Sequence, residues 1–464
     1  MSILDTILAW ISFALVCFAV CVAPWLFGAW EMWWFWPFAV CIFAAAFCFS
    51  VRLVSGGRLL RTHRLHFTPA GTTVAVSFAV FLAYAFVRSR QSPVFMDAER
   101  SLMLFLTSFL LAGVIVIGFS RSQLRALYAM VVVNLLCLGL YGIINHWVTG
   151  SHKVLWVTSG FTQYAGRATG TYFCPDHYSG LMELLLALAL GLLLAPRADG
   201  NSDTRKTRYR IWMVVAGLMI PVALYGVWIS QSRGGGLTVL AILAAALLVW
   251  TGRFRSGPRW GIRLGGLAVC IAVVVMLWNS NSTYINRFKE LTPFDRSGGL
   301  SLSGAAESAS SRIKENIRYN MYSAAYRAWL DTDPWFGIGP GMHQHLWFHY
   351  AASPDGDRAR GIWPSRPNFD THAHQVHNDW LQLLEEYGVA GIVIFLVWTC
   401  AMLVVLIKGY RLRLSPAMAL GAGLCLACMA MHSLVDFNLQ IPATVWLFAV
   451  VLAVPFALIQ REAQ

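Results

Sequence analysis

The sequence predicts an all-α, polytopic membrane protein with about twelve transmembrane helices. Hydrophobic residues make up 58% of the 464-residue chain and charged residues only 12%, whereas a soluble domain carries about 25% charged residues. The apolar residues gather into runs of roughly 17–23 residues, each long enough to cross a bilayer as a helix. A net charge of +13 would suggest nucleic acid as the partner of a soluble protein, but here it indicates basic cytoplasmic loops. We therefore expect membrane lipids as surroundings and no nucleic-acid partner.

Twelve apolar runs account for the predicted helices. They lie at 6–23, 32–51, 70–87, 101–119, 124–144, 178–195, 211–230, 235–251, 262–278, 389–407, 416–434 and 441–459. The first run is preceded by Asp5 and by no base, which predicts a retained helix and not a cleaved signal peptide. Nine of the ten cysteines lie within apolar runs, where a thiol packs as a small hydrophobe, so no disulfide framework is expected.

The distribution of basic residues predicts the orientation of the helices. With the N-terminus in the cytoplasm, nineteen Lys and Arg fall in cytoplasmic segments and six in the short outer segments. Because basic residues accumulate in cytoplasmic loops, both termini are predicted to be cytoplasmic. We divide the chain into an N-terminal bundle of five spans (1–145), spans six to nine (146–278), an outer loop domain (279–388) and three closing spans (389–464).

The outer loop domain contains one predicted helix followed by a turn. Ile317, Met321, Ala324, Ala325 and Ala328 form an apolar stripe at helical spacing, which predicts a helix over 312–331. The sequence DTDPWFGIGPG at 331–341 is rich in Gly and Pro and predicts a turn that ends this helix.

A histidine-rich stretch lies where the loop domain enters the membrane. His372, His374 and His377 precede Asn378 and a helical run that ends at Gly388. Asn is a good helix starter, so His377 is expected just ahead of a helix N-terminus. An imidazole with a pKa near ~6.5 is the usual proton acceptor at neutral pH. His374 and His377 are therefore alternative candidates for a general base.

Three arginines are predicted to reach the same outer face. Arg167 precedes the sixth span, Arg233 follows the seventh and Arg318 lies on the loop helix. The planar guanidinium fork matches two phosphate oxygens at once, so these arginines and a histidine suit a lipid-linked pyrophosphate. The alternatives are an interfacial anchor for Arg167, close helix packing at the glycines after Arg233, and an ion pair with Glu315 or another loop acid for Arg318. Arg327 is a rival on the same helix.

Other classes of function are disfavoured by what the sequence lacks. An ion pathway needs ionisable groups at mid-membrane depth, and Glu183, about one turn into its span, is almost alone there. The three glycines at 234–236 lack the Lys-Ser/Thr of a phosphate loop, which excludes a nucleotide site of that kind. The outer histidines fit no standard zinc-ligand spacing and no cysteine joins them. We expect no metal and no cofactor.

The motifs together resemble a known family. His377-Asn378 is followed by nine residues and then by Gly388-Val-Ala-Gly391, and SRG (232–234), RATGTYF (167–173) and DPWFGIGPG (333–341) accompany it. This pattern resembles the O-antigen ligase-like superfamily of bacterial membrane glycosyltransferases, which includes O-antigen ligases, some O-antigen polymerases and protein O-oligosaccharyltransferases. The resemblance covers roughly 150–440. It departs from the family at Cys174-Pro175-Asp176, where relatives often have Asn-Pro-Asn.

The resemblance implies an all-helical, GT-C-like glycosyltransferase of the bacterial inner membrane with a periplasmic active site. It implies metal-independent, inverting transfer of an undecaprenyl-pyrophosphate-linked glycan. The acceptor would be lipid A-core for a ligase, a growing glycan for a polymerase and a protein Ser or Thr for a protein glycosyltransferase; a lipid-linked glycan transporter would form no bond. The roles carried over are the base for His377 and pyrophosphate binding for Arg167, Arg233 and Arg318. His374, Asn378 and Arg327 are possible auxiliary residues.

Overall fold

Membrane-length helices make up most of the chain. The computed structural model describes residues 3–55, 67–195, 203–252, 261, 263, 317–350 and 373–463. Within these residues, ten helices are long and apolar enough to cross a membrane, which confirms the all-α polytopic class. They are α1 (Ile3–Val22), α2 (Met32–Val54), α4 (Pro69–Gln91), α5 (Phe95–Gly113), α6 (Arg121–Thr149), α7 (Pro175–Leu194), α8 (Asp203–Ser230), α9 (Arg233–Thr251), α15 (Asp379–Arg411) and α17 (Pro442–Glu462).

Two of the twelve predicted runs are not among these ten helices. The run at 416–434 forms α16 (Pro416–His432), an apolar helix of 17 residues. The run at 262–278 lies outside the described residues, apart from Arg263. The predicted loop helix is α13 (Ile317–Asp331), and its expected stripe is buried at Met321, Ala324, Ala325 and Ala328.

The remaining elements are short. They are 3-10 turns η1 (Ala23–Trp25), η2 (Phe27–Ala29), η4 (Thr162–Tyr164) and η6 (Asn438–Gln440), a π-helical turn η3 (Val114–Gly118), helix α14 (His343–Tyr350), and strands β1 (Lys153–Val154) and β2 (Val157–Thr158). The two strands pair antiparallel.

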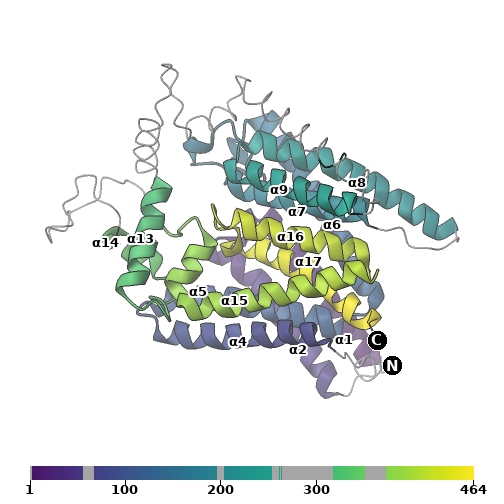
Figure 1. The fold of residues 1–464 in the computed structure, drawn as a ribbon, viewed down its shortest axis with the longest axis horizontal. Helices are drawn as coiled ribbons and strands as arrows, with labels where there is room; N and C mark the ends of the chain where they lie inside the picture. The colour runs from purple at the N-terminus through teal and green to yellow at the C-terminus, as the bar shows by residue number, and fades with distance from the viewer. Residues whose placement is uncertain are drawn as a thin grey trace.

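The long helices run between two ends of the bundle. Both chain termini lie at one end, and α13 and α14 lie at the other (Figure 1). This arrangement agrees with the predicted topology, in which the termini and the loop domain are on opposite sides of the membrane. The assignment of those sides to cytoplasm and periplasm rests on the basic residues alone.

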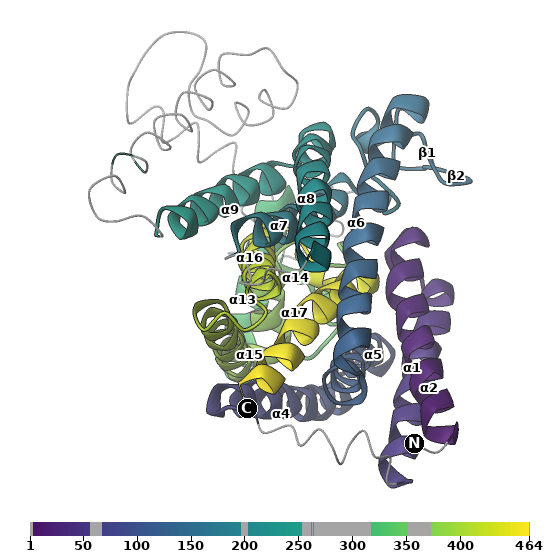
Figure 2. The same cartoon turned by 90° about the vertical axis from the view of Figure 1, so that its right-hand side faces the viewer.

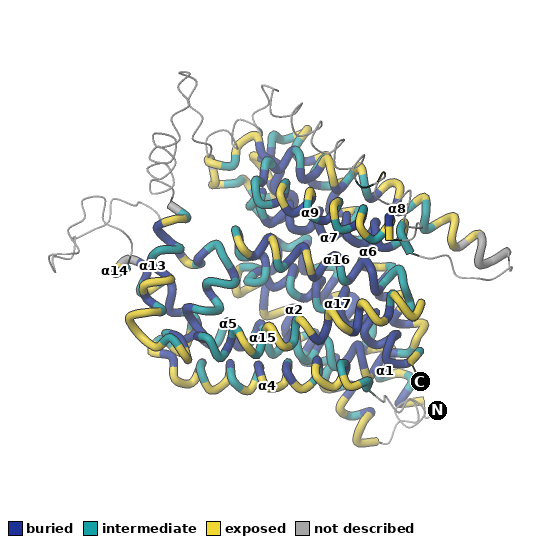
Figure 3. The backbone as a smooth tube through the Cα atoms, in the orientation of Figure 1, coloured by how far each residue is buried: buried dark blue, intermediate teal, exposed yellow. Residues whose placement is uncertain are grey.

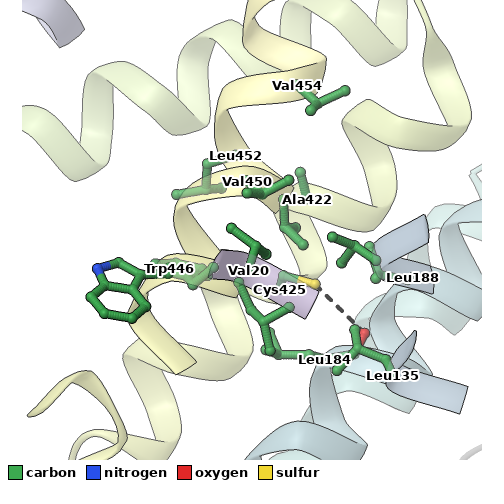
Figure 4. Packing of buried hydrophobic residues seen from close by; sticks show 14 of the residues in the cluster. Val20, Leu135, Leu184, Leu188, Ala422, Cys425, Trp446, Val450, Leu452 and Val454 are labelled. Carbon is green, nitrogen blue, oxygen red and sulfur yellow. Dashed lines mark hydrogen bonds between the residues drawn. The ribbon is translucent and has the colours of Figure 1, made fainter. Parts of the chain in front are cut away.

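The core is centred on α7 and α17. In their most apolar windows, 83% of α7 and 89% of α17 is buried inside the protein, whereas α4 and α8 expose one side along the edges of the bundle (Figure 3). Figure 2 shows α7, α16 and α17 between α6 and α9. Helices α7 and α16 approach closely because glycines face each other: a Cβ on Gly191 would lie 2.5 Å from Gly421. The buried Cys425 thiol packs there, 3.7 Å from the Leu184 carbonyl oxygen (Figure 4).

Helix α15 is interrupted at Gly388, where the sequence predicted the end of a helical run. Gly388 has φ 64° and ψ −170°, a conformation open essentially to glycine alone. The turn after α13 satisfies the backbone groups freed by this break: Val389 N–H donates to the Pro334 carbonyl at 3.0 Å, and Ile338 N–H donates to Glu385 at 2.8 Å. The DPWFGIGPG turn and the break at Gly388 are thus held together by these hydrogen bonds. The same bonds hold the first part of α15 in place.

Candidate active site

A polar cluster lies at the α13 end of the bundle. It is built from the N-terminal ends of α7, α9 and α15, from α13, and from the segment 433–441 between α16 and α17. It contains two carboxylates, Asp436 and Asp176, and several arginine or histidine side chains lie within 4 Å of each. The cluster is otherwise surrounded by apolar helices.

His377 is held against Asp436. Its Nδ1 lies 3.1 Å from Asp436 Oδ1, and the carboxylate is 1% exposed. An ionised carboxylate only accepts hydrogen bonds, so Nδ1 carries the proton and Nε2 carries the lone pair. His377 has φ 57°, a left-handed conformation that is uncommon for a non-glycine residue. Tyr322 Oη donates to the His377 carbonyl at 2.8 Å and helps to hold the backbone there.

Asn378 starts the helix that follows His377. Its side chain accepts from Leu381 N–H at 3.0 Å, which is the N-cap arrangement predicted from the sequence. Asp379 N–H donates to the Ser433 carbonyl at 2.8 Å. Asp379 Oδ2 in turn accepts from the Ser433 hydroxyl at 2.7 Å and from Leu439 N–H at 3.1 Å. These bonds tie the start of α15 to the segment that carries Asp436.

Two further imidazoles face the same carboxylate. Asp436 Oδ2 lies 3.8 Å from His177 Nε2 and 3.9 Å from His432 Nε2, distances that are electrostatic contacts and too long for hydrogen bonds. The Phe437 ring lies between two imidazoles, with its centroid 4.6 Å from His177 and 4.6 Å from His377. Asp436 is thus surrounded by three histidines.

Glu183 extends the cluster into the membrane-spanning part of the bundle. His432 Nδ1 lies 2.7 Å from Glu183 Oε1, and both side chains are 1% exposed. Since α7 begins at Pro175, Glu183 lies more than two turns into the helix, deeper than the single turn predicted from the sequence. A buried ionisable pair at such a depth marks a functional region more often than a purely structural one.

Asp176 joins two of the three predicted arginines. Its Oδ1 accepts from Arg167 at 3.1 Å and its Oδ2 accepts from Arg318 at 2.9 Å. Arg167 Nε also donates to the Ser230 carbonyl at 2.9 Å, and the residue is 8% exposed. Arg167 is therefore a buried, fixed guanidinium, and the alternative of an interfacial anchor is wrong.

Arg318 pairs with a residue far away in the sequence. It contacts Asp176, 142 residues away, and donates to the Val435 carbonyl at 2.8 Å. Glu315, the partner considered from the sequence, lies outside the described residues. Arg327 is exposed on α13. The structure thus brings Arg167, Arg318 and His377 into one cluster through Asp176 and Asp436.

Arg233 is the first residue of α9, directly after the N-cap Ser232. The glycines that follow it pack against the cluster: a Cβ on Gly235 would meet Ser179 Oγ at 1.8 Å and Glu183 at 3.2 Å, and one on Gly234 would meet His432 Nε2 at 3.3 Å. The triple glycine therefore permits close packing of α9 on α7 and α16, as one alternative predicted. That same packing sets Arg233 at the edge of the cluster.

Three other histidines of the outer loop have partners other than Asp436. His374 is exposed and lies 2.8 Å from Gln344, so it is removed from the buried carboxylate that holds His377. His343 pairs with Glu385 at 2.8 Å and His345 with Asp97 at 2.7 Å; His372 lies outside the described residues. Over the described ranges, no group of three or more potential metal ligands is found.

The surroundings shift the pKa values of the residues outside the helical spans. Burial lowers the pKa of His377 below its ordinary value, and Arg318 and His177 lower it further against the opposing effect of Asp436. Burial acts to raise the pKa of Asp436, but His177, His377 and Arg318 outweigh it and hold that pKa well below its usual range. Hence His377 is neutral and Asp436 is ionised at neutral pH, the protonation states required of a general base and its orienting carboxylate.

Comparison with known proteins supports the family resemblance predicted from the motifs. The fold and the cluster define a multi-pass membrane protein with a buried polar site at one end of the bundle. Residues 218–396 match the family model described as O-antigen ligase, and this confirms the resemblance predicted from the motifs. Members of that family are membrane glycosyltransferase-like enzymes. The match includes Arg233, Arg318 and His377. No curated protein matches the chain.

Sequence reasoning missed the carboxylates that organise the site. Asp176 entered only as a departure from the family pattern, and Asp436, His177 and His432 were not considered. One signal was available: Asp436 is the single acidic residue between Arg413 and Arg461, a position where an isolated charge is costly. Its partners were not predictable, because His377 and Asp436 are 59 residues apart.

Proposed function

We propose that this chain transfers a lipid-linked glycan to an acceptor hydroxyl, as an O-antigen ligase does, with His377 as the general base. The observation that carries the proposal is the neutral His377 held by the buried Asp436, in the same cluster as the guanidinium groups of Arg167 and Arg318. A positioned base and fixed cations beside one another are what glycosyl transfer from a pyrophosphate requires.

The reaction begins at His377 Nε2. As the acceptor oxygen attacks the anomeric carbon of the donor sugar, its proton moves to Nε2. The new carbon–oxygen bond forms on the face opposite the departing group, so the configuration inverts. The bond between the anomeric carbon and the pyrophosphate oxygen breaks, and its electron pair leaves with the pyrophosphate. Asp436 stabilises the imidazolium that results, and no metal is needed because pyrophosphate is a good leaving group.

The arginines stabilise the charge that develops on the pyrophosphate. Arg167 and Arg318 are already oriented by Asp176, so they need little reorganisation when charge appears. Arg233, at the start of α9, adds a third cation and the N-terminal end of a helix dipole, which also favours an anion. One such pre-placed donor is worth a factor of roughly 10²–10³ in rate.

The proposed substrates follow from the family. The donor is an undecaprenyl-pyrophosphate-linked glycan and the acceptor is lipid A-core, at the periplasmic face of the bacterial inner membrane. Support for this side comes from α13, which carries Arg318 and lies at the end opposite both termini (Figure 1), and from the basic residues that predict cytoplasmic termini.

Complementation of a gene deletion tests the proposal. Deletion should abolish attached glycan while free lipid-linked polymer persists, and wild-type protein should restore the attached ladder, whereas His377→Ala should not despite normal amounts in the membrane. Loss of the polymer itself would identify a polymerase, and loss of glycan from an exported protein would identify a protein glycosyltransferase. Near-normal transfer by His377→Ala would remove His377 from the role of base.

A further inference from the structure

His177 lies in the polar cluster but has no role in the mechanism proposed above. It is in the first turn of α7, which begins at Pro175, and it is 5% exposed. Its Nε2 lies 3.8 Å from Asp436 Oδ2, while the other carboxylate oxygen, Oδ1, lies 3.1 Å from His377 Nδ1. Asp436 therefore lies between two imidazoles, and each imidazole faces a different oxygen.

The Phe437 ring contacts both of these imidazoles. Its centroid lies 4.6 Å from each imidazole centroid, and the ring planes cross at 83° for His177 and at 82° for His377. Edge-to-face contacts of this kind are a preferred geometry for planar rings. The contacts restrict rotation of both imidazoles, so His177 Nε2 stays directed at Asp436.

A second imidazole near Asp436 Oδ2 has a carboxylate of its own. His432 Nε2 lies 3.9 Å from Asp436 Oδ2, and His432 Nδ1 lies 2.7 Å from Glu183 Oε1. A proton on His432 is therefore compensated by Glu183. Among the described residues, Asp436 is the one carboxylate within 4 Å of the His177 imidazole. A positive charge on His177 thus acts mainly on Asp436.

Asp436 needs a compensating cation. Its carboxylate is 1% exposed, and an ionised carboxylate is costly to remove from water unless another charge compensates it. Arg318 contributes, but it donates to Asp176 at 2.9 Å and is shared between the two carboxylates. His377 is neutral and supplies no charge. A protonated His177 supplies it, and it also adds positive charge to a cluster that is to receive a pyrophosphate.

We infer that His177 is protonated and acts as a positioning residue, which holds Asp436 Oδ2 so that Oδ1 stays on His377 and the base enters the reaction neutral. The inference rests on the proposed function, in which His377 accepts the proton of the acceptor hydroxyl. The charge on His177 lowers the pKa of His377, as the charge on Arg318 does.

Other charged or titratable groups also face these two imidazoles and Asp436, and the variants below leave them unchanged. They are Tyr164 and Cys174 before α7, Asp176 on α7, Arg318 and Tyr322 on α13, Asp379 on α15 and His432 on α16. A change at His177 alone therefore reports the charge of that imidazole.

Solid-state NMR of the full-length protein in lipid nanodiscs observes the two imidazoles directly. Asp176-His177 is the single Asp-His pair in the chain, and Val376-His377 is the single Val-His pair. Isotope-labelled aspartate or valine carbonyl carbon, combined with isotope-labelled histidine nitrogen, therefore selects each residue without any substitution. At neutral pH both ring nitrogens of His177 should be protonated, while His377 Nε2 should be unprotonated. A neutral His177 under these conditions would overturn the inference.

His177→Gln removes the charge and keeps a side chain that can donate to Asp436. The pKa of His377 should rise by about 1 pH unit. Relative to the wild type, transfer should therefore fall severalfold at about pH 6 and recover at about pH 8. Tyr178→Phe is the matched control, because it alters the next buried residue of α7 and loses a hydrogen bond to the Gly139 carbonyl but no charge. Loss of transfer by His177→Gln at every pH, with the pKa of His377 unchanged, would leave His177 a structural role only and overturn the inference.

The NMR titration separates this inference from the proposed function, because it does not depend on glycan transfer. A protonated His177 and a raised His377 pKa in His177→Gln, together with unchanged glycan attachment in the deletion strain, would support the pairing and refute the proposed transfer. Transfer that requires His377 but is unaffected by His177→Gln at any pH would refute this inference alone.

Discussion

Replacement of Asp436 by asparagine tests the catalytic arrangement most directly. The side chain keeps its shape but loses the charge that lies 3.1 Å from His377 Nδ1. Without the carboxylate, nothing fixes the tautomer with its lone pair at Nε2, and nothing compensates the imidazolium formed in the transition state. A general base contributes roughly 10²–10⁴ in rate, and the comparable change in a serine protease costs about 10⁴. We expect Asp436→Asn to lose transfer by a factor of about 10²–10⁴.

The assay is the rate of glycan attachment in membranes from the deletion strain, normalised to the amount of each variant present. Asp379→Asn is the control, because Asp379 is a nearby buried carboxylate whose Oδ2 accepts from the Ser433 hydroxyl and from Leu439 N–H. It should report any loss caused by packing alone. The double variant His377→Ala with Asp436→Asn should be no slower than His377→Ala, since residues that act as one unit are not additive.

The pH dependence of Asp436→Asn has a predicted sign. Asp436 raises the pKa of His377 against the lowering by burial. Its removal should lower that pKa further, so the acid limb of the residual activity should move to lower pH. Transfer by Asp436→Asn within about threefold of the wild type, while His377→Ala is inactive, would refute the pairing as a catalytic device.

Three further outcomes follow from the geometry. Because burial lowers the pKa of His377, and a base works when deprotonated, wild-type transfer should stay constant near neutral pH and fall only below about pH 6.5; an acid limb above pH 7 would contradict this. Asp176→Asn leaves Arg167 and Arg318 facing each other, which should reduce stability by roughly 3 kcal/mol. Inorganic pyrophosphate should raise the melting temperature of that variant more than that of the wild type, and an equal rise would argue against an anion site. Gly388→Ala should lower the free energy of unfolding by about 1–3 kcal/mol through backbone strain alone, and by more because its Cβ would lie 2.4 Å from Trp335. Gly113→Ala should fold normally, because a Cβ there would meet no heavy atom within 4 Å. The melting temperatures of the two purified variants test this difference.

The sequence alone was sufficient for the helices and for part of the site. Runs of apolar residues predict membrane helices because their length and hydrophobicity are local properties, independent of what packs against them. Eleven of the twelve predicted runs coincide with described helices, and the twelfth, apart from Arg263, lies outside the described residues. The motif around His377 and Gly388 also predicted its local structure correctly. An N-cap at Asn378 and a helix break at a glycine depend only on the adjacent backbone.

Only the tertiary structure decided which side chains meet. Arg318 reaches Asp176 across 142 residues, and His432 reaches Glu183 across 249. Such pairs depend on the relative placement of α7, α13 and α16, which follows from the packing of many small contacts and glycines and not from any local pattern. Hydrophobicity therefore determined that these helices exist and cross the membrane, whereas their packing determined that one buried carboxylate would orient His377 and another would hold two arginines.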